Sequence, residues 1–392
     1  MSRRARLLAG AAAALLAVAA WAAVSGLATG TGAAVPDAAQ ASLAVSAALG
    51  GGDPAGYARA LAPRPLVFPA DAGPHPDFRT EWWYYTGNVE SAGGRHFGFQ
   101  LTFFRAALAP PGPAAPRASA WAARQLYLAH FALTDTAGRR FQAWSRLGRE
   151  ALGLAGARAE PFRVWVDDWS AEGQSPGGLA VRLRAAEGDV AIDLGLRSEK
   201  PVVLQGDRGL SRKGPEPGNA SYYYSLSRMA VRGTVRAAGE SIAVAGLAWM
   251  DREWSTSALG PGLVGWDWFA LQLDDGRDVM IYRLRRRDGA ADPHSAGAVI
   301  AADGAPRALG ADETALAVLG DWTSPRSGVR YPSRWRLTVP TAGLDLELVP
   351  RLPDQELLLG TRYWEGAVRV AGTAAGRPVA GRGYVELVGY GE

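Results

Sequence analysis

The stretch GLAWMDREWSTSALGPGLVGWDWFALQL, residues 246–273, holds the densest cluster of acidic and aromatic side chains in the 392-residue chain. Residues two apart in a β-strand share a face, so this spacing predicts that Trp249, Asp251 and Glu253 lie on one side of a strand. A second aromatic strand starts at Gly265, after a Gly-Pro-Gly turn. Two such strands around one cavity would give the mostly apolar lining of a small-molecule site. The alternative is that the indoles are core and the acids are paired or solvated.

Asp251 and Glu253 are the candidate catalytic residues of this stretch. If their face lines a cavity, the two carboxyls lie ~7 Å apart along the strand. Poor hydration and like charge both oppose ionisation, so at least one of them should have a raised pKa. A carboxylic acid kept neutral near pH 7 can donate a proton. Surrounding indole faces would stabilise a cation formed by that step.

Composition excludes several classes of site. The chain has no Cys, which excludes disulfides, thiolate catalysis and Cys-ligated metal. Its four His residues show no metal-ligand spacing, so no metal site is predicted. The formal net charge of +4 falls to +1 without residues 1–34, which carry three Arg and no acidic residue. This gives no electrostatic case for a nucleic-acid partner.

The N-terminal segment has the layout of an export signal. Three Arg residues precede an apolar run from Leu7 to Ala28, followed by small residues. Residues 1–34 are therefore predicted to be a signal peptide or an N-terminal membrane anchor, and the protein to be periplasmic or extracellular. Membrane contact is expected only through this segment. Residues 35–62 read as a linker with a possible short helix.

From Leu66 onward, short strand patterns are separated by Gly, Pro, Asp and Asn clusters, which is typical of all-β proteins. Residues 83–105 and 267–287 share an order: an aromatic strand, a Gly-Arg turn, then an alternating apolar strand. This internal repeat predicts two tandem β domains, 63–238 and 239–392, with the boundary at a turn. Superposition of the halves is predicted to pair residues 84–89 with 268–273.

A second aromatic cluster, HPDFRTEWWYYTGNV at residues 75–89, contains two indoles and two phenols in a row. Tyr hydroxyls and an indole N–H beside an apolar cavity would orient a hydrophobic ligand. The alternative is a strand buried on both faces with an Arg79–Glu81 ion pair. Together with the SYYYS run at 221–225, this gives the candidate ligand-binding residues His75, Glu81, Trp82, Trp83, Tyr84, Tyr222, Tyr224, Trp249, Trp254, Trp266, Asp267 and Trp268.

The strings EWWYYTGN (residues 81–88) and WMDREW (residues 249–254) carry a family resemblance. From about Tyr57 to its end, the chain resembles the AttH-like, carotenoid 1,2-hydratase-like group of lipocalin-like proteins. The resemblance implies two consecutive lipocalin-like (calycin-type) antiparallel β-barrel domains. Exported members of the group carry the label of secreted hydrolases and are associated with ABC-transporter permeases, which makes such a permease a candidate partner.

In the hydratase branch of this group, water adds to a terminal carbon–carbon double bond of an acyclic carotenoid without a cofactor. The resemblance places Asp251 at the position of the acid that protonates the alkene. That branch has a Tyr where this chain has Trp249, and a His and a Trp where it has Tyr222 and Tyr224. Two functions are therefore expected. The first is binding of a hydrophobic small molecule, a lipid or isoprenoid. The alternative is a cofactor-free hydratase, isomerase or hydrolase acting on an apolar substrate with Asp251 as proton donor.

Overall fold

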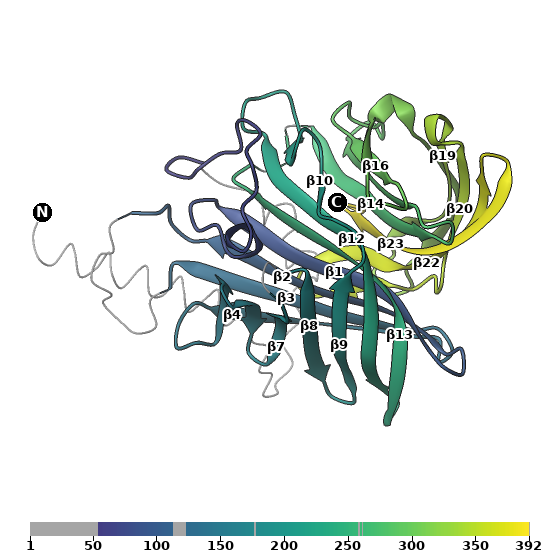
Figure 1. Cartoon of the computed structure of the whole chain (residues 1–392), viewed down its shortest axis with the longest axis horizontal. Coiled ribbons are helices and arrows are strands. Elements are labelled where there is room, and N and C mark those ends of the chain that lie inside the picture. The colour runs from purple at the N-terminus through teal and green to yellow at the C-terminus, as the bar shows by residue number, and fades with distance from the viewer. Residues whose placement is uncertain (1–53, 113–122, 176–177, 258, 261, 392) are drawn as a thin grey trace, which may run out of the picture. The chain divides into compact units, whose positions relative to one another are not determined.

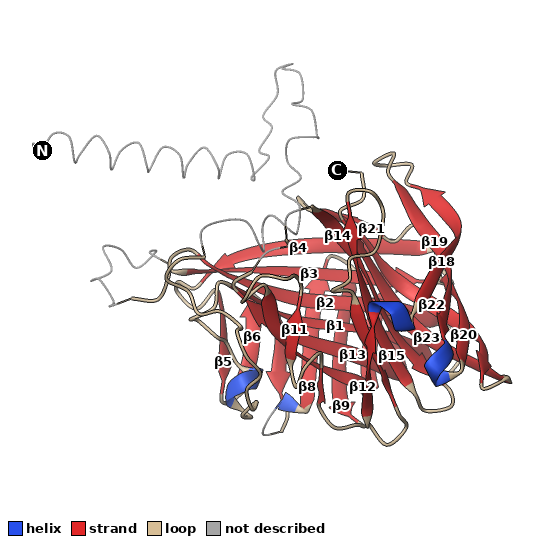
Figure 2. Ribbon diagram, turned by 90° about the horizontal axis from the view of Figure 1, so that it is seen from above, coloured by secondary structure: helices blue, strands red, loops and turns tan. Residues whose placement is uncertain are grey.

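The computed structural model describes residues 54–112, 123–175, 178–257, 259–260 and 262–391. The predicted signal peptide or anchor and residues 35–53 of the predicted linker lie outside these ranges. Regular structure in the described residues is almost entirely β-strand (Figure 2). The short 3₁₀ turns are η2 (Ala70–Ala72), η4 (Ala311–Glu313) and η5 (Pro340–Ala342). No helix among the described residues has the length and apolar character needed to span a membrane.

Two antiparallel sheets make up the fold (Figure 1). The first has 13 strands: β1 (Thr80–Ser91), β2 (His96–Ala107), β3 (Gln125–Asp135), β4 (Arg140–Arg149), β5 (Ala155–Ala159), β6 (Phe162–Val166), β7 (Trp169–Gly173), β8 (Ala180–Glu187), β9 (Val190–Ser198), β10 (Val203–Leu204), β11 (Leu210–Arg212), β12 (Ala220–Ala237) and β13 (Glu240–Ser255). The second has 10 strands: β14 (Leu263–Leu273), β15 (Asp278–Arg286), β16 (Ala296–Ile300), β17 (Pro306–Gly310), β18 (Ala315–Thr323), β19 (Arg330–Val339), β20 (Leu344–Pro350), β21 (Glu356–Leu358), β22 (Arg362–Ala374) and β23 (Arg377–Val388).

The predicted all-β fold of two lipocalin-like barrels is confirmed, with one barrel nearly closed and the other a half-barrel. In the first sheet, β5 and β6 pack against β3 and β4, so the sheet curls round on itself. Its interior is filled by apolar side chains that include Trp83, Phe131 and Trp254. The second sheet has its own core around Phe269 and Trp335.

The strand order confirms an internal repeat. It is β4-β3-β2-β1-β13-β12-β9-β8 in the first sheet and β17-β16-β15-β14-β23-β22-β20-β19 in the second. The β12–β13 and β22–β23 hairpins turn at Ala238-Gly239 and Ala375-Gly376, with positive φ at all four residues. Positive φ at both central positions is the requirement of a type I′ hairpin turn. The two halves therefore share their topology and this turn.

Two details of the sequence prediction are corrected. Aligning the equivalent turns at Gly94 and Gly276 pairs Tyr84 with Trp266, two residues from the predicted partner. The pair of residues 238–239 is a turn inside the first sheet, because β13 pairs with both β1 and β12. The chain changes sheet later, between Ser255 and Leu263. The acidic strand 249–253 therefore belongs to the first barrel, and the strand that carries Trp266 and Trp268 belongs to the second.

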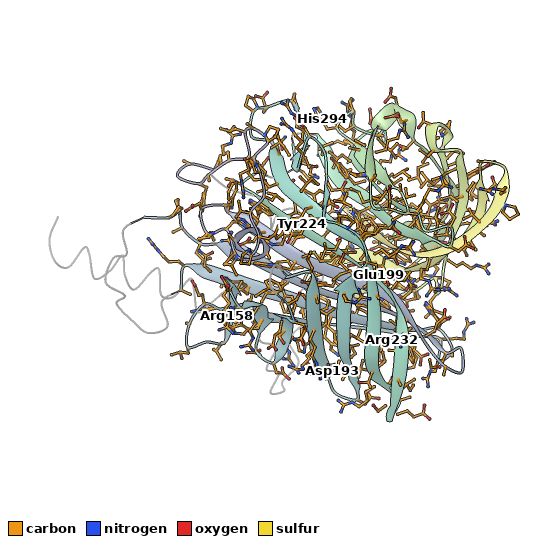
Figure 3. The ribbon with its side chains drawn as sticks, in the orientation of Figure 1. Arg158, Asp193, Glu199, Tyr224, Arg232 and His294 are labelled. Atoms are coloured by element: carbon orange, nitrogen blue, oxygen red, sulfur yellow. The ribbon has the colours of Figure 1, made fainter. Side chains whose placement is uncertain are left out.

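The two sheets pack face to face along β1, β2, β12 and β13 on one side and β14, β22 and β23 on the other. Strand β1 is consequently buried on both faces, with Trp83 and Tyr85 in the first core and Tyr84 toward the second sheet. This junction has its own cluster of buried side chains, which includes Trp249, Trp268 and Tyr384. Figure 3 shows Tyr224 near the centre of the molecule, and Asp193 and Arg232 lower in the view, on β9 and β12 of the first sheet.

A buried ion cluster fastens the sheets at this junction. Asp278 of β15 accepts from Lys200 Nζ at 2.7 Å and from Arg228 Nη2 at 2.7 Å. Ser227 adds a hydrogen bond of 2.9 Å to the same carboxylate. Asp278 is fully buried, so these three partners replace the water it loses on folding. All three lie on the first sheet or directly after its strand β9, and they hold the second sheet in place.

Candidate functional site

A pocket of about 140 Å³ opens between the two sheets. Its walls are mainly aromatic, formed by Trp82, Tyr84, Phe104, Trp266, Trp268 and Tyr282. Three carboxyl groups line it, from Asp251, Glu253 and Glu386. A few polar groups among many aromatic ones is the composition of a small-molecule site. The volume is below the roughly 300–1,000 Å³ of pockets that enclose a whole drug-sized ligand. A pocket of this volume encloses only part of a drug-sized molecule.

Asp251 lies between Tyr84 of β1 and Ser225 of β12 in the register of the first sheet. Its Oδ1 accepts hydrogen bonds from Ser225 Oγ at 2.5 Å and Trp249 Nε1 at 2.7 Å. Its Oδ2 accepts from the Tyr223 hydroxyl at 2.5 Å. The Tyr223 hydroxyl in turn accepts from Trp268 Nε1 at 3.2 Å, which connects this carboxyl to the second sheet.

Burial raises the pKa of Asp251 from 3.8 to about 7. The three hydrogen bonds to the carboxylate act in the opposite direction, and the nearby charge of Glu253 adds to the increase. No Arg or Lys forms an ion pair with Asp251 among the described residues. The raised pKa agrees with the expectation for at least one of the two acids. Asp251 therefore changes its charge near neutral pH.

Glu253 has a different environment, although it shares a face with Asp251. Its Oε1 accepts from the Ser221 hydroxyl and lies 3.3 Å from Lys213 Nζ. That ammonium group also lies 3.9 Å from the centre of the Tyr282 ring. Lys213 therefore balances the charge of Glu253, and its position over the ring adds a cation–π contact.

Glu386 of β23 supplies the third carboxyl, from the second sheet. Its Oε2 accepts from Trp266 Nε1 at 2.9 Å. Burial raises its pKa from 4.5 to about 7, and the charges of Asp251 and Glu253 push it the same way. Glu386 and Asp251 thus face one pocket from opposite sheets, and each has a pKa near neutrality.

A second polar network lies behind the pocket. Glu365 of β22 is the register partner of Glu386 and accepts a hydrogen bond from the Tyr84 hydroxyl. Burial and the charge of Glu386 raise the pKa of Glu365 well above its usual value. Nearby, His130 Nδ1 lies 2.6 Å from the Tyr363 hydroxyl. This network joins a wall residue of the pocket to the interior of the junction.

The structure brings about half of the predicted site residues to this pocket. Six of them line it: Asp251, Glu253, Trp82, Tyr84, Trp266 and Trp268. Trp249 does not line the pocket but donates a hydrogen bond to Asp251. The others lie elsewhere: His75, Glu81, Trp83, Tyr222, Tyr224, Trp254 and Asp267.

The residues outside the pocket have structural partners. Glu81 is held by the buried guanidiniums of Arg105 and Arg252, and not by Arg79 as the alternative interpretation expected. His75 lies against Glu81 and stacks on Trp254, with ring centres 3.8 Å apart. Trp83, Tyr222 and Tyr224 fill the first barrel. Asp267 pairs with Arg285 at 2.9 Å and accepts from Tyr390 at 2.9 Å.

Sequence reasoning missed Tyr223, Lys213 and Glu386. In the run 221–225, Tyr222 and Tyr224 point into the barrel, so Tyr223 and Ser225 are the residues that reach Asp251. A shift of one residue exchanges the two faces of a strand. Glu386 could have been found from the repeat, because aligning the two Ala-Gly turns makes it the equivalent of Trp249 in the second half. Lys213 lies in an irregular segment before β12 and has no comparable signal.

Metal ligands do not gather in the described parts of the chain: they contain no group of three or more His, Asp or Glu side chains arranged to hold an ion.

Comparisons with known proteins agree with this architecture. The AttH-like family matches residues 59–390, and the chain belongs to that family. A protein described as AttH from Nitrosomonas europaea, known from a crystal structure, is 38% identical to this chain. That match covers 85% of this chain and 99% of the other, with a TM-score of 0.74.

A second solved structure, kievitone hydratase from Nectria haematococca, shares the fold at 17% identity. The match covers 83% of this chain and 94% of that protein, with a TM-score of 0.64. None of the curated proteins matches this chain in sequence.

Proposed function

We propose that the pocket between the sheets binds the end of an apolar molecule and that Asp251 moves a proton there in a cofactor-free reaction of the hydratase type. The observation that carries this proposal is the Asp251 carboxyl, buried in an aromatic pocket with a pKa of about 7. An acid–base group is most effective when its pKa is near the working pH. A hydratase with the same fold adds support.

The pocket walls suit an alkene substrate. Protonation of a trisubstituted alkene produces a tertiary carbocation, and the faces of Trp82, Trp266 and Trp268 would stabilise such a cation. Water then adds to the cation and gives a tertiary alcohol. The proposed substrate class is an acyclic isoprenoid whose terminal isopropylidene group enters the pocket.

Hydrolysis has weaker support than hydration. Ester hydrolysis by a serine nucleophile needs a base within hydrogen-bond reach of the hydroxyl. Of the three pocket serines, Ser221 donates to Glu253, whose charge Lys213 balances, Ser255 donates to the Ala220 carbonyl, and Ser257 donates to the Asn219 side chain. No His lines the pocket among the described residues.

Incubation with a panel of acyclic isoprenoids in H₂¹⁸O tests the proposal. We expect at least one compound with a terminal isopropylidene group to gain one ¹⁸O atom, measured by mass spectrometry, while its saturated analogue does not react. The saturated analogue should still bind, because the apolar end is unchanged. If the alkene binds and no ¹⁸O is incorporated, the protein is a binding protein and the hydratase proposal is wrong.

Export and a transporter partner remain part of the proposal because of the N-terminal sequence and the family resemblance. We propose that residues 1–34 direct the chain across the membrane, where it exchanges its ligand with an ABC-transporter permease. In cell fractionation, the protein is expected in the periplasm or medium, and a chain without residues 1–34 in the cytoplasm. Equal cytoplasmic retention of both chains would contradict this.

A further inference from the structure

Glu386 and Asp251 reach the same pocket from different sheets, but their hydrogen bonds differ. Asp251 accepts three hydrogen bonds, from Ser225, Trp249 and Tyr223. Glu386 accepts one, from Trp266 to Oε2. Its Oε1 receives no hydrogen bond from any described residue. This oxygen is not fully enclosed by protein, and Glu386 lines the pocket, so Oε1 is open to the pocket.

Hydrogen bonds donated to a carboxylate favour its ionised form, and burial without them favours the neutral acid. Three donors therefore stabilise the charge on Asp251, whereas Glu386 gains much less from its single donor. Two nearby carboxyls that repel each other share their protons as a pair. The first proton taken up by this pair is expected on Glu386.

The other charged and titratable groups around Glu386 agree with this order. Glu253 on β13 adds negative charge, and its partner Lys213 lies on that side of the pocket. Glu365 on β22 is the cross-strand neighbour of Glu386. Tyr84 of β1 donates to Glu365, so it gives no proton to Glu386. No Lys, Arg or His forms an ion pair with Glu386 among the described residues.

We propose that Glu386 is the proton donor of the pocket and that Asp251 is the base that activates water. This inference rests on the proposed hydratase function and reverses the donor role that the sequence suggested for Asp251. The Oε1 oxygen of Glu386 is open to the pocket, where a substrate carbon can lie. Among the described residues, Asp251 Oδ2 accepts one hydrogen bond, from Tyr223, which leaves a lone pair for a water proton.

The reaction balances with water as the co-reactant. Glu386 gives its Oε1 proton to the less substituted alkene carbon, and the π electrons form the new C–H bond. Water attacks the tertiary cation, its oxygen lone pair forms the C–O bond, and its proton passes to Asp251. The proton then returns from Asp251 to Glu386. The pair ends with one proton, as it began, and the net change is addition of one water.

Infrared spectroscopy tests the protonation state without any substrate. The C=O stretch of a carboxylic acid differs from that of a carboxylate, so wild type minus variant difference spectra reveal which carboxyl holds the proton. At pH 7, we expect Glu386→Gln to lose more of the carboxylic acid band than Asp251→Asn does. The matched control is Glu347→Gln, an exposed residue of the second sheet paired with Arg334, which should leave the band unchanged.

A larger loss of the carboxylic acid band in Asp251→Asn than in Glu386→Gln would overturn the assignment. The assignment would also fail if neither variant lost any of this band. Trp266→Phe provides a second route if Glu386→Gln does not fold. It removes the N–H that Trp266 donates to the Glu386 carboxylate, so the acid band should persist to higher pH. An unchanged titration of the band in Trp266→Phe would also overturn the proposal.

Isotope exchange in D₂O then tests the roles in catalysis. Asp251→Asn should still exchange hydrogen at the alkene, because Glu386 can deliver and retrieve a proton, but it should not form alcohol. Glu386→Gln should lose both exchange and hydration, by on the order of 10²–10⁴-fold. Exchange retained in Glu386→Gln and lost in Asp251→Asn would show the reverse roles. If wild type neither exchanges nor hydrates any substrate, the proposed function fails, while the infrared result still decides where the proton lies.

Discussion

Glu81→Ala is expected to lower the free energy of unfolding by about 3–5 kcal/mol, the cost of breaking a buried ion pair from one side. Glu81 is fully buried and lies between Arg105 and Arg252, which are also fully buried. Its removal leaves two guanidinium groups in the first barrel without their carboxylate. Urea unfolding followed by circular dichroism measures the change. A loss below about 1 kcal/mol, the range of an exposed ion pair, would contradict it.

The matched control for Glu81 is Glu240→Ala. Glu240 pairs with Arg95 at 3.0 Å, but its side chain is 68% exposed. Its removal is therefore expected to change stability by about 0.5 kcal/mol or less. A double variant, Glu81→Ala with Arg252→Met, separates two causes. It should be more stable than Glu81→Ala alone if the unpaired buried charge causes the loss.

The pH dependence of the Glu81 variant has a definite sign. Burial alone would raise the pKa of Glu81, but the charges of Arg252 and Arg105 outweigh it and hold the pKa well below its ordinary value. A lowered pKa in the folded state contributes stability above the ordinary carboxyl pKa, and this stability is lost as pH falls through the folded pKa. The difference between wild type and Glu81→Ala should therefore be largest near neutral pH and shrink in acid.

Asp251→Asn is expected to reduce turnover of a hydratable alkene by on the order of 10²–10⁴-fold, the usual contribution of a general acid or base. Asparagine has nearly the same shape, but its amide cannot carry the transferred proton. Its oxygen can still accept from Trp249 and Ser225, and its NH₂ group can donate to the Tyr223 hydroxyl, so the pocket should keep its form. Steady-state kinetics should show the loss in kcat, with KM little changed.

The same variant has a predicted stability profile. Burial raises the pKa of Asp251 from 3.8 to about 7, so the native carboxyl contributes stability only at low pH, and this is lost as pH rises through about 7. Between pH 3.8 and about 7, the free energy of unfolding of Asp251→Asn should therefore rise relative to wild type by up to about 1.4 kcal/mol per pH unit. Thermal melts of both proteins at pH 5 and pH 8 measure this.

Asp345→Asn is the matched control for Asp251→Asn. Asp345 lies on the surface of β20 and pairs with exposed Arg336, so neither kcat nor stability should change appreciably. A loss of several kcal/mol in Asp251→Asn at both pH values would show that the Asp251 carboxylate mainly holds its three donors in place. The proton-transfer role would then be rejected.

The sequence predicted those features that depend on local alternation. The facing of Trp249, Asp251 and Glu253 followed from the two-residue period of a strand, and the repeat followed from two similar hairpins. Glu81 and His75 lie outside the pocket. Their positions could not be foreseen, because a buried ion pair and a binding residue look the same in sequence. Arg105 and Arg252, the partners of Glu81, come from two other strands. Their proximity depends on the register of the first sheet, which local patterns do not give.

The position of Glu386 illustrates the same limit across the two halves. Glu386 and Asp251 are 135 residues apart and meet only because the second sheet packs on β1, β12 and β13. A glutamate in an apolar strand such as GYVELV is a visible signal. The sequence could show that this residue is unusual, but its opposing group depends on how the sheets pack.

The separate cores of the two halves also influence how such proteins can diversify. Most of the side chains that stabilise each half lie in its own core, whereas Asp251, Glu386 and Trp249 lie at the junction. Substitutions at the junction can therefore accumulate during evolution while both halves still fold. A descendant could acquire a new substrate by exchanging a few junction residues, with the folding of its two halves largely inherited.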